Sequence, residues 1–290
     1  MTDTIRNIVS LFKLRIGVAI MLSAVAGLAI TPGPALPLWK IMVLALAVML
    51  SSASAGAFNQ YVERDLDAKM PRTSDRPFVN GTFQPGLFWL TVIVAILAVA
   101  VLAAGLATNW AAAFYVFLGA FIYGVVYTMW LKRRSWLNIV VGGLSGSFAV
   151  LAGAAAVDPN LAPAPIILAV VMFLWTPPHF WSLAAALHSE YAQAKVPMLP
   201  VVVGHAAAAK IILAHTVVLV ALSLTPVFFG LGWIYLIGAA AGGYLFVRRS
   251  IALVRQPGPQ AAMANFKASL LQLGLLLLAA MADAWIGAPL

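Results

Sequence analysis

The chain has 290 residues, of which 63% are hydrophobic and 9% are charged, and its formal net charge is +9. Its uncharged runs are continuous and close to 20 residues long, which predicts membrane-spanning helices and excludes a barrel of alternating strands. Membrane topology explains the excess of Lys and Arg, so we expect no nucleic-acid partner. Because the chain has no cysteine, disulfides, cysteine metal sites and a thiol nucleophile are excluded.

Nine spans are predicted, in chain order at residues 16–30, 38–61, 85–106, 110–130, 136–157, 166–187, 207–229, 233–247 and 266–286. Basic residues precede the first span as they do in a signal peptide, but the second follows at once and no cleavage motif is convincing, so we interpret it as a retained span. Pro177 and Pro178 are expected to interrupt the sixth span. The predicted fold class is all-α, a polytopic membrane protein with one domain over residues 1–290.

The distribution of basic residues tests this count. Nearly every Lys and Arg lies before the first span or after the second, fourth, sixth and eighth, and only Lys40 lies on the other side. Such alternation is what the positive-inside rule requires of a correct count. We therefore expect a cytoplasmic N-terminus and a C-terminus on the far side of the membrane.

One stretch stands apart, FNQYVERDLDAKMPRTSDRP at residues 58–77, which carries eight charges within fourteen residues. Asn59, Glu63 and Asp67 recur every four residues and share one face if the preceding helix continues. Their oxygen atoms suit a hard cation such as Mg²⁺. Basic residues follow at once, and carboxylates with Lys and Arg nearby are typical of diphosphate binding. We therefore expect a magnesium diphosphate with a polyprenyl tail; the alternative is a solvated loop with local salt bridges.

The Asn-x3-Glu-x3-Asp pattern resembles the first acidic motif of the UbiA superfamily of intramembrane prenyltransferases, with Glu63 in place of the first Asp. Four stretches resemble more narrowly the protoheme IX farnesyltransferase family: DAKMPRTSDRP (67–77), LKRRSWLNIVVGG (131–143), WTPPHFWSLA (175–184) and EYAQAKVPMLPVVVG (190–204). The chain departs from that family at Glu190, where Asp is usual, and at Ala194, where a further carboxylate is missing. It also lacks the family's Pro pair after Gly143.

This resemblance implies nine helices around a central cavity in the inner membrane. It implies transfer of the farnesyl group of farnesyl diphosphate to a vinyl group of haem b, which gives haem O for haem-copper terminal oxidases. Mg²⁺ would accompany the diphosphate, and haem b would be a substrate rather than a cofactor. Besides membrane lipid, the implied candidate partners are the downstream haem A synthase or oxidase assembly factors.

The predicted site residues come from the acidic motif, the basic loops and the later motifs. The catalytic candidates are Asn59, Glu63, Asp67, Lys69 and Arg72; the substrate-binding candidates are Arg76, Lys132, Arg133, Asn138, His179, Glu190, Tyr191 and Lys195; the metal candidates are Asn59, Glu63, Asp67 and Glu190. Some have a simpler interpretation. His179 can be a packed core residue, Asn138 can cap a helix, and Lys132 and Arg133 can be topology signals.

Two other functions remain open at this point. One is a UbiA-type prenyltransferase acting on a quinone precursor, which the later motifs disfavour. The other is a transporter of an anionic lipid or metabolite. Transporters place their charges near the middle of the bilayer, whereas these carboxylates follow the ends of predicted helices.

Overall fold

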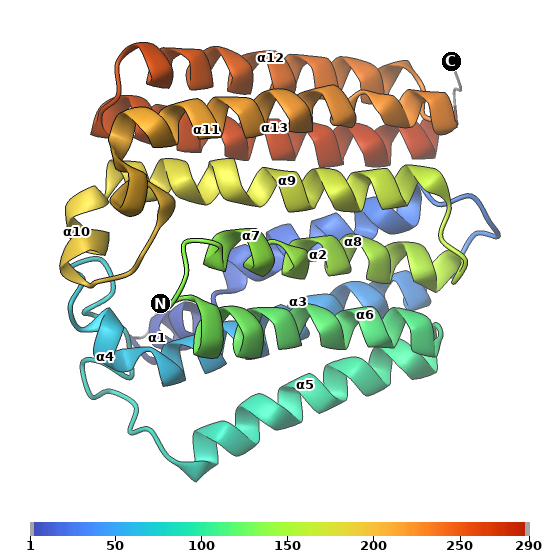
Figure 1. Ribbon diagram of the computed structural model, residues 1–290. Helices are drawn as coiled ribbons and strands as arrows, with labels where there is room; N and C mark the ends of the chain where they lie inside the picture. Colours follow the sequence, from blue (N-terminus) through green and yellow to red (C-terminus); the bar gives the residue numbers. More distant parts are fainter. Residues whose placement is uncertain (1–2, 288–290) are drawn as a thin grey trace.

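The computed structural model describes residues 3–287, and every regular element in that range is a helix (Figure 1). In order, the elements are α1 (Asp3–Leu11), α2 (Leu14–Ala29), α3 (Leu38–Val62), α4 (Arg64–Asp67), α5 (Leu87–Ala107), α6 (Trp110–Phe121), the π-helix η1 (Ile122–Leu131), α7 (Asn138–Gly142), α8 (Leu144–Val157), α9 (Pro163–Ala186), α10 (His188–Gln193), α11 (Leu199–Ser223), the 3-10 helix η2 (Thr225–Phe229), α12 (Trp233–Arg255) and α13 (Pro259–Ile286). The predicted all-α class is confirmed.

The span count also agrees with the prediction. Eight helical segments of the described chain are long and apolar enough to cross a membrane, and α1 with α2, bent by 45°, makes a ninth when the pair is taken as one span. The described chain begins with α1 at one end of the bundle, and α13 finishes at the other (Figure 1). An odd number of spans requires that the first and the last span have their outer ends on opposite sides of the membrane.

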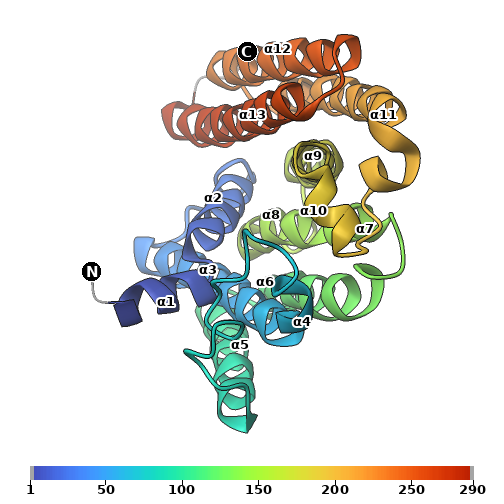
Figure 2. The same ribbon diagram turned by 90° about the vertical axis from the view of Figure 1, so that its left-hand side faces the viewer.

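The helices surround the bundle axis, as seen along that axis in Figure 2. Helix α2 packs on α3 and α8, α9 packs on α11 and α13, and α12 packs on α13, while α5 lies on the outside against α3 and α6. Glycines permit the closest of these contacts. A Cβ on Gly153 would lie 1.8 Å from the carbonyl oxygen of Ala24, and one on Gly27 would lie 2.2 Å from that of Val150. The α2–α8 contact therefore depends on small residues, as is typical of membrane helices.

The expectation that Pro177 and Pro178 interrupt the sixth span is wrong, because α9 continues through both. Contacts with α13 hold the helix on each side of the proline pair. Trp175 Nε1 donates to the carbonyl oxygen of Ser269 at 3.0 Å, and His179 Nδ1 lies 2.7 Å from the Ser269 hydroxyl. In a membrane, neighbouring helices can support a helix that contains proline in this way.

Other helix boundaries differ from the predicted ones by whole helical turns. Helix α12 reaches Arg255, eight residues beyond the predicted end at residue 247, and α13 begins at Pro259 rather than 266. Residues 188–205, which lie between the sixth and seventh predicted spans, contain α10 and the first turn of α11. Gly204, with φ +80° and ψ 168°, marks a kink after that turn. Hydropathy reports the uncharged stretch of a span, so it does not report the charged or polar turns through which the helix continues.

Candidate functional site

The candidate site is the turn between α3 and α4, at the end of the bundle where α1 and α10 also lie (Figure 1). We call this the site end. Helix α3 stops because Glu63 has non-helical dihedral angles, φ −95° and ψ 13°. The amide of Glu63 nevertheless donates to the carbonyl of Asn59 at 2.9 Å, and the amide of Asp67 donates to that of Glu63 at 2.8 Å. These bonds preserve the four-residue spacing, so the three side chains share one face.

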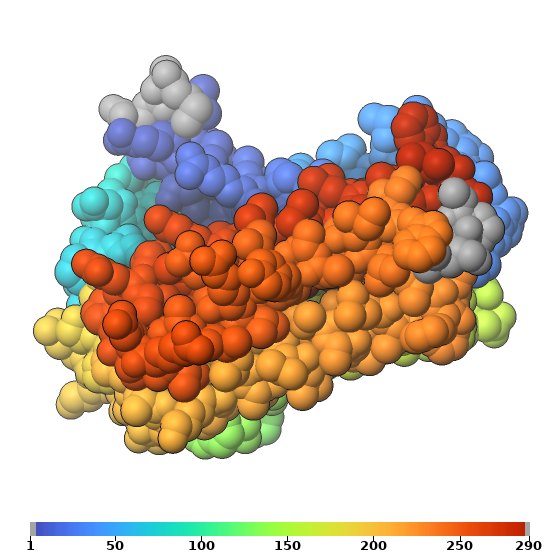
Figure 3. Space-filling model, turned by 90° about the horizontal axis from the view of Figure 1, so that it is seen from above, coloured from blue at the N-terminus to red at the C-terminus, as the bar shows by residue number. Residues whose placement is uncertain are grey.

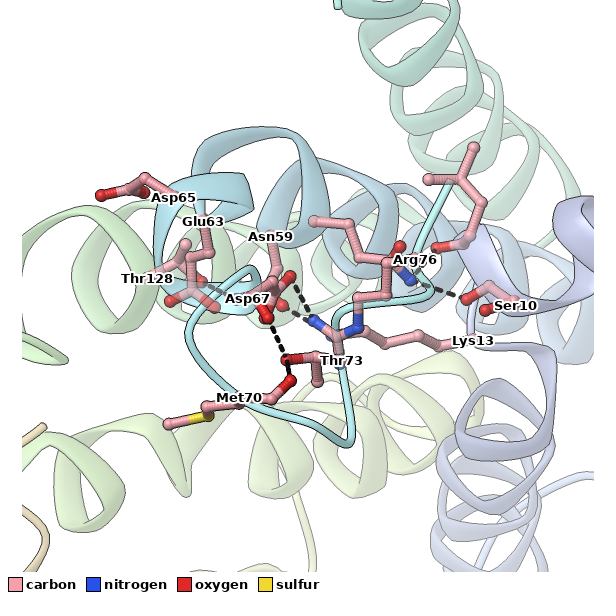
Figure 4. Close-up of polar contacts among 12 residues, drawn as sticks. Ser10, Lys13, Asn59, Glu63, Asp65, Asp67, Met70, Thr73, Arg76 and Thr128 are labelled. Carbon is pink, nitrogen blue, oxygen red and sulfur yellow. Dashed lines mark hydrogen bonds and ion pairs between the residues drawn. The ribbon is translucent and has the colours of Figure 1, made fainter. Parts of the chain in front are cut away.

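All three of these side chains are buried, with exposed fractions of 2% for Asn59, 0% for Glu63 and 3% for Asp67. Each contacts a cation from a different segment. Lys13 Nζ donates to Asn59 Oδ1 at 2.6 Å, and Arg76 Nη1 pairs with Asp67 Oδ2 at 2.6 Å (Figure 4). Lys132 Nζ pairs with Glu63 Oε2. A buried carboxylate is costly unless it is paired and hydrogen-bonded. The alternative of a solvated loop is therefore wrong for this face.

Lys13 is the site residue that the sequence interpretation missed. It lies in the break between α1 and α2 with a left-handed backbone, φ 47°. Gln60 Nε2 fixes the end of α1 by donating to the carbonyl of Ser10 at 2.7 Å. The stem of Lys13 passes over Gly56, where an added Cβ would meet it at 3.3 Å. The only available signal was a lone lysine before an apolar span, which is also the pattern of a topology signal.

The π-helix η1 brings Lys132 to the site. Asn59 Nδ2 donates to Thr128 Oγ1 at 3.0 Å, and that hydroxyl donates five residues back, to the carbonyl of Tyr123, at 2.8 Å. Asn138 Nδ2 donates to the carbonyl of Lys132 at 3.3 Å. The N-cap of α7 is Leu137, so the alternative role of Asn138 as a helix cap is wrong. Its Oδ1 is buried and has no hydrogen-bond partner.

The other predicted basic residues do not reach the buried face. Arg133 makes a bidentate pair with Asp65 at 2.6 and 2.8 Å, and both side chains are exposed. The hydrogen bonds from Arg133 lower the pKa of the Asp65 carboxyl. Lys69 and Arg72 are exposed. Of the basic residues that follow the acidic motif, Arg76 is the one that contacts it.

The second polar loop, residues 187–198, lies beside the first polar loop, residues 63–76 (Figure 2). One apolar cluster joins them, since Leu66 and Met70 from the first pack with Tyr191 from the second. Glu190 Oε2 is buried without a hydrogen-bond partner. Lys195 is exposed and has a left-handed backbone, φ 56°. The second loop thus brings Glu190 and Tyr191 toward the site end but no paired cation.

His179 is buried in the bundle with an exposed fraction of 6%. Its ring stacks between Trp175, at a centroid distance of 4.1 Å, and Phe266, at 4.5 Å. The hydroxyl of Ser269 lies 2.7 Å from His179 Nδ1 and also contacts the carbonyl oxygen of Phe266 at 2.7 Å. Stacking and this hydrogen bond hold the ring of His179 against α13.

The acidic face can hold a cation. Residues 3–287 contain no cluster of three or more His, Asp or Glu side chains placed to bind a metal ion, because these acids pair with Lys and Arg rather than with one another. Glu63 Oε1, however, is a buried acceptor with no partner. With the carboxylate of Asp67 and the amide oxygen of Asn59, it forms an oxygen set of the kind that Mg²⁺ prefers.

Residues 20–276 match the UbiA prenyltransferase family. The chain belongs to this family. It is 56% identical over 283 residues to protoheme IX farnesyltransferase 2 of Paramagnetospirillum magneticum, covering 98% of each chain. It is 46% identical to protoheme IX farnesyltransferase 1 of the same organism, covering 97% of this chain and 99% of that one. These relatives confirm the resemblance inferred from the motifs.

Solved UbiA structures share the fold. A digeranylgeranylglyceryl phosphate synthase superposes with a TM-score of 0.80 and 17% identity, covering 98% of this chain and 99% of that one. A UbiA homologue of Archaeoglobus fulgidus bound to DMAPP and Mg²⁺ has a TM-score of 0.70 and 16% identity, covering 95% and 99%. The chain is thus a multi-pass membrane prenyltransferase of the UbiA fold, as predicted.

Proposed function

We propose that this UbiA family member is a magnesium-dependent protoheme IX farnesyltransferase, which transfers the farnesyl group of farnesyl diphosphate to a vinyl group of haem b. The observation that carries the proposal is the face of three buried oxygen-bearing side chains, each in contact with a cation from a separate segment. The names of its relatives support the acceptor and the donor. The buried site combines carboxylates, which can bind a metal ion, with Lys and Arg side chains, which can bind diphosphate oxygens. This combination suits a metal diphosphate better than a simple anion.

Asn59, Glu63 and Asp67 would hold Mg²⁺, which when bound supplies positive charge to the leaving diphosphate. The solved structure of the Archaeoglobus fulgidus UbiA homologue bound to DMAPP and Mg²⁺ supports this requirement in the family. Glu63 Oε1 is the acceptor that the protein leaves without a partner. The same three residues orient the head group at the site end, while the apolar spans accommodate the farnesyl tail.

The three cations have a second task. Lys13, Arg76 and Lys132 balance the acidic face. When the head group binds, their N–H groups can turn to the diphosphate oxygens, where negative charge increases as the leaving group departs. Cations already held in place by the fold need little reorganisation in the transition state, which is the main source of electrostatic catalysis. Lys69 and Arg72 can add to this field from the exposed side.

The transfer conserves atoms and charge. The bond between farnesyl C1 and oxygen breaks, and pyrophosphate leaves with the bonding electrons. A carbon–carbon bond forms between C1 and the end of the haem vinyl group, water adds to the remaining cationic carbon, and one proton is lost. The product is haem O. Exclusion of water until the new bond has formed protects the allylic cation from hydrolysis.

Haem b is proposed to bind beside the second polar loop. Arg133 and Lys195 are exposed cations that can pair with the haem propionates. Glu190, Tyr191 and Asn138 supply polar atoms near the first loop, two of which are buried acceptors without partners. His179 is proposed for a haem contact or for proton transfer. Glu190 is also the candidate ligand for a second metal ion.

The protein is proposed to span the inner membrane as one domain over residues 1–290, with a cytoplasmic N-terminus. The support is the charge distribution, since nearly every Lys and Arg belongs to the site end. Farnesyl diphosphate and haem b would then reach the site from the cytoplasm. Haem A synthase or oxidase assembly factors are the proposed partners that receive haem O.

The test uses membranes that contain the protein, supplied with farnesyl diphosphate, Mg²⁺ and haem b. We expect pyrophosphate release and a farnesylated haem, identified by mass spectrometry, only when all three are present. Pyrophosphate release that depends on a quinone precursor instead of haem would favour the other prenyltransferase. Transport of an anion without pyrophosphate release would favour the transporter. Membranes without the protein are the control.

A further inference from the structure

Helix α12 carries arginines directly after a short uncharged stretch. Its uncharged part, residues 233–247, is about 22 Å long at 1.5 Å per residue, whereas the hydrocarbon core of a bilayer is about 30 Å thick. Arg248 and Arg249 follow directly, and the helix continues for two more turns to Arg255. The first pair of arginines therefore begins inside the depth that lipid tails would normally occupy, where an uncompensated charge is costly.

These residues form a groove on the outside of the protein. Tyr244, Arg248, Ile251 and Arg255 are spaced by four, three and four residues, so they lie along one face of α12. They line a groove of about 510 Å³, in which Tyr244 has an exposed fraction of 65%. Figure 3 looks onto α11, α12 and α13, with α12 as the outermost layer of the bundle. The groove faces the surrounding lipid rather than the interior of the bundle.

Nothing in the described part of the protein neutralises this groove. Among residues 3–287, none of Arg248, Arg249 and Arg255 has an ion pair or side-chain hydrogen bond; the described ion pairs belong to Arg76, Lys132 and Arg133. The carboxylate of Asp283, on the neighbouring α13, cannot neutralise these arginines because it lies at the opposite end of α12. There it accepts hydrogen bonds from the amides of Gly232 and Tyr235. The counter-charge must come from outside the protein.

We propose that this groove, which we call the α12 groove, binds the headgroup of an anionic phospholipid. The guanidinium groups of Arg248 and Arg255 would pair with its phosphate, and Ile251 and Tyr244 would contact the upper part of the acyl chains. An arginine one or two turns inside the helix end draws the headgroup toward it, which relieves the mismatch between the short uncharged stretch and the bilayer. A soluble anion would leave the apolar part of the groove uncovered, which favours a lipid.

The proposal is tested on the full-length protein in detergent, titrated with phosphatidylglycerol, with phosphatidylcholine and with inorganic phosphate. Native mass spectrometry measures bound lipid, and a melting curve measures stabilisation. We expect phosphatidylglycerol to bind at least about tenfold more tightly than phosphatidylcholine and to raise the melting temperature. The double variant Arg248→Gln/Arg255→Gln should lose this preference, whereas Arg248→Lys/Arg255→Lys, which keeps the charge, should retain most of it.

The matched control is Arg134→Gln, which removes an exposed arginine of the site end that lies outside the α12 groove. It should bind phosphatidylglycerol as the unaltered protein does. Equal binding of the two lipids, or an unchanged preference in the Gln double variant, would overturn the proposal. So would displacement of phosphatidylglycerol by millimolar phosphate, which would indicate a site for soluble anions. Because no readout is enzymatic, the result is independent of the proposed reaction.

Discussion

The two polar loops at the site end carry the same kinds of residue but in different electrostatic states. In the first loop, Glu63 and Asp67 are buried, and each pairs with a cation. In the second, Glu190 has a buried oxygen without a partner, and the nearby Lys195 is exposed. A carboxylate in a polar loop is therefore not enough to identify a head-group site; the counter-charges that the fold supplies distinguish the two.

The sequence and packing of the second loop explain this electrostatic difference between the two loops. Ala194, at the position where a further carboxylate is missing, is buried in the apolar cluster that contains Leu66 and Met70 of the first loop. A charge there would lie inside that cluster without a paired cation, which is strongly unfavourable. The second loop thus supports the first by packing, and the proposal places the diphosphate chiefly at the first.

The largest effect is expected from Asp67→Ala, which removes one of the two buried carboxylates of the first loop and leaves Arg76 without its partner. Haem O formation should fall at least about 100-fold, the loss typical of removing one group that stabilises transition-state charge. Pigment analysis of membranes measures the product, and immunoblotting of the membrane fraction shows that the protein is inserted. Asp75→Ala, which removes an exposed carboxylate of the same loop, is the matched control. Normal haem O content in the Asp67 variant would contradict the assignment of the first loop.

Lys132→Met should affect both stability and activity. It leaves Glu63 buried without its cation, and breaking a buried ion pair from one side costs about 3 kcal/mol or more. The double variant Lys132→Met/Glu63→Gln removes both charges, so it should recover stability in detergent melting curves without recovering activity. Arg134→Met, in the same loop but exposed, should change neither. Recovery of activity in the double variant would show that the pair is structural.

Lys13→Met should lower kcat/KM for farnesyl diphosphate, because Lys13 is proposed to hold the diphosphate both when it binds and as it departs. A hydrogen bond to a charged group contributes about 1.5–3 kcal/mol, so kcat/KM should fall about tenfold or more, with kcat lowered as well. Initial rates of pyrophosphate release measure both constants. Arg15→Met is the control, since Arg15 is exposed two residues further on. Equal kcat/KM values for the two variants would indicate that Lys13 serves membrane topology alone.

The smallest effect is expected from Glu190→Gln, because the second loop has no paired cation with which to hold a diphosphate. Activity should fall less than about tenfold, as expected for the loss of a single polar contact. The same assay, run beside Asp67→Ala, compares the two loops directly. A loss as large as that of the Asp67 variant would make the loops equivalent and would indicate a second metal site at Glu190.

The sequence predicted the architecture well because each span carries its own signal. Length, hydropathy and the alternation of basic loops are local properties, and they gave nine spans and the all-α class. The prediction that a proline pair interrupts α9 is wrong because it treated the helix alone. Trp175 and His179 bind α13 on either side of the pair, and that support comes from residues about 90 positions away.

The candidate site also has a part that local sequence predicted and a part that only the tertiary structure decided. The four-residue spacing of Asn59, Glu63 and Asp67 is a local property, which the backbone hydrogen bonds from Glu63 to Asn59 and from Asp67 to Glu63 preserve across the break between α3 and α4, so the sequence by itself predicted that they share a face. Which cations meet that face was decided only by tertiary structure: Lys13 comes from 46 residues before Asn59, and Lys132 from 69 residues after Glu63. Lys69 and Arg72, although adjacent in sequence, remain exposed. Periodicity fixes neighbours within a helix, but contacts between distant segments depend on how the helices pack.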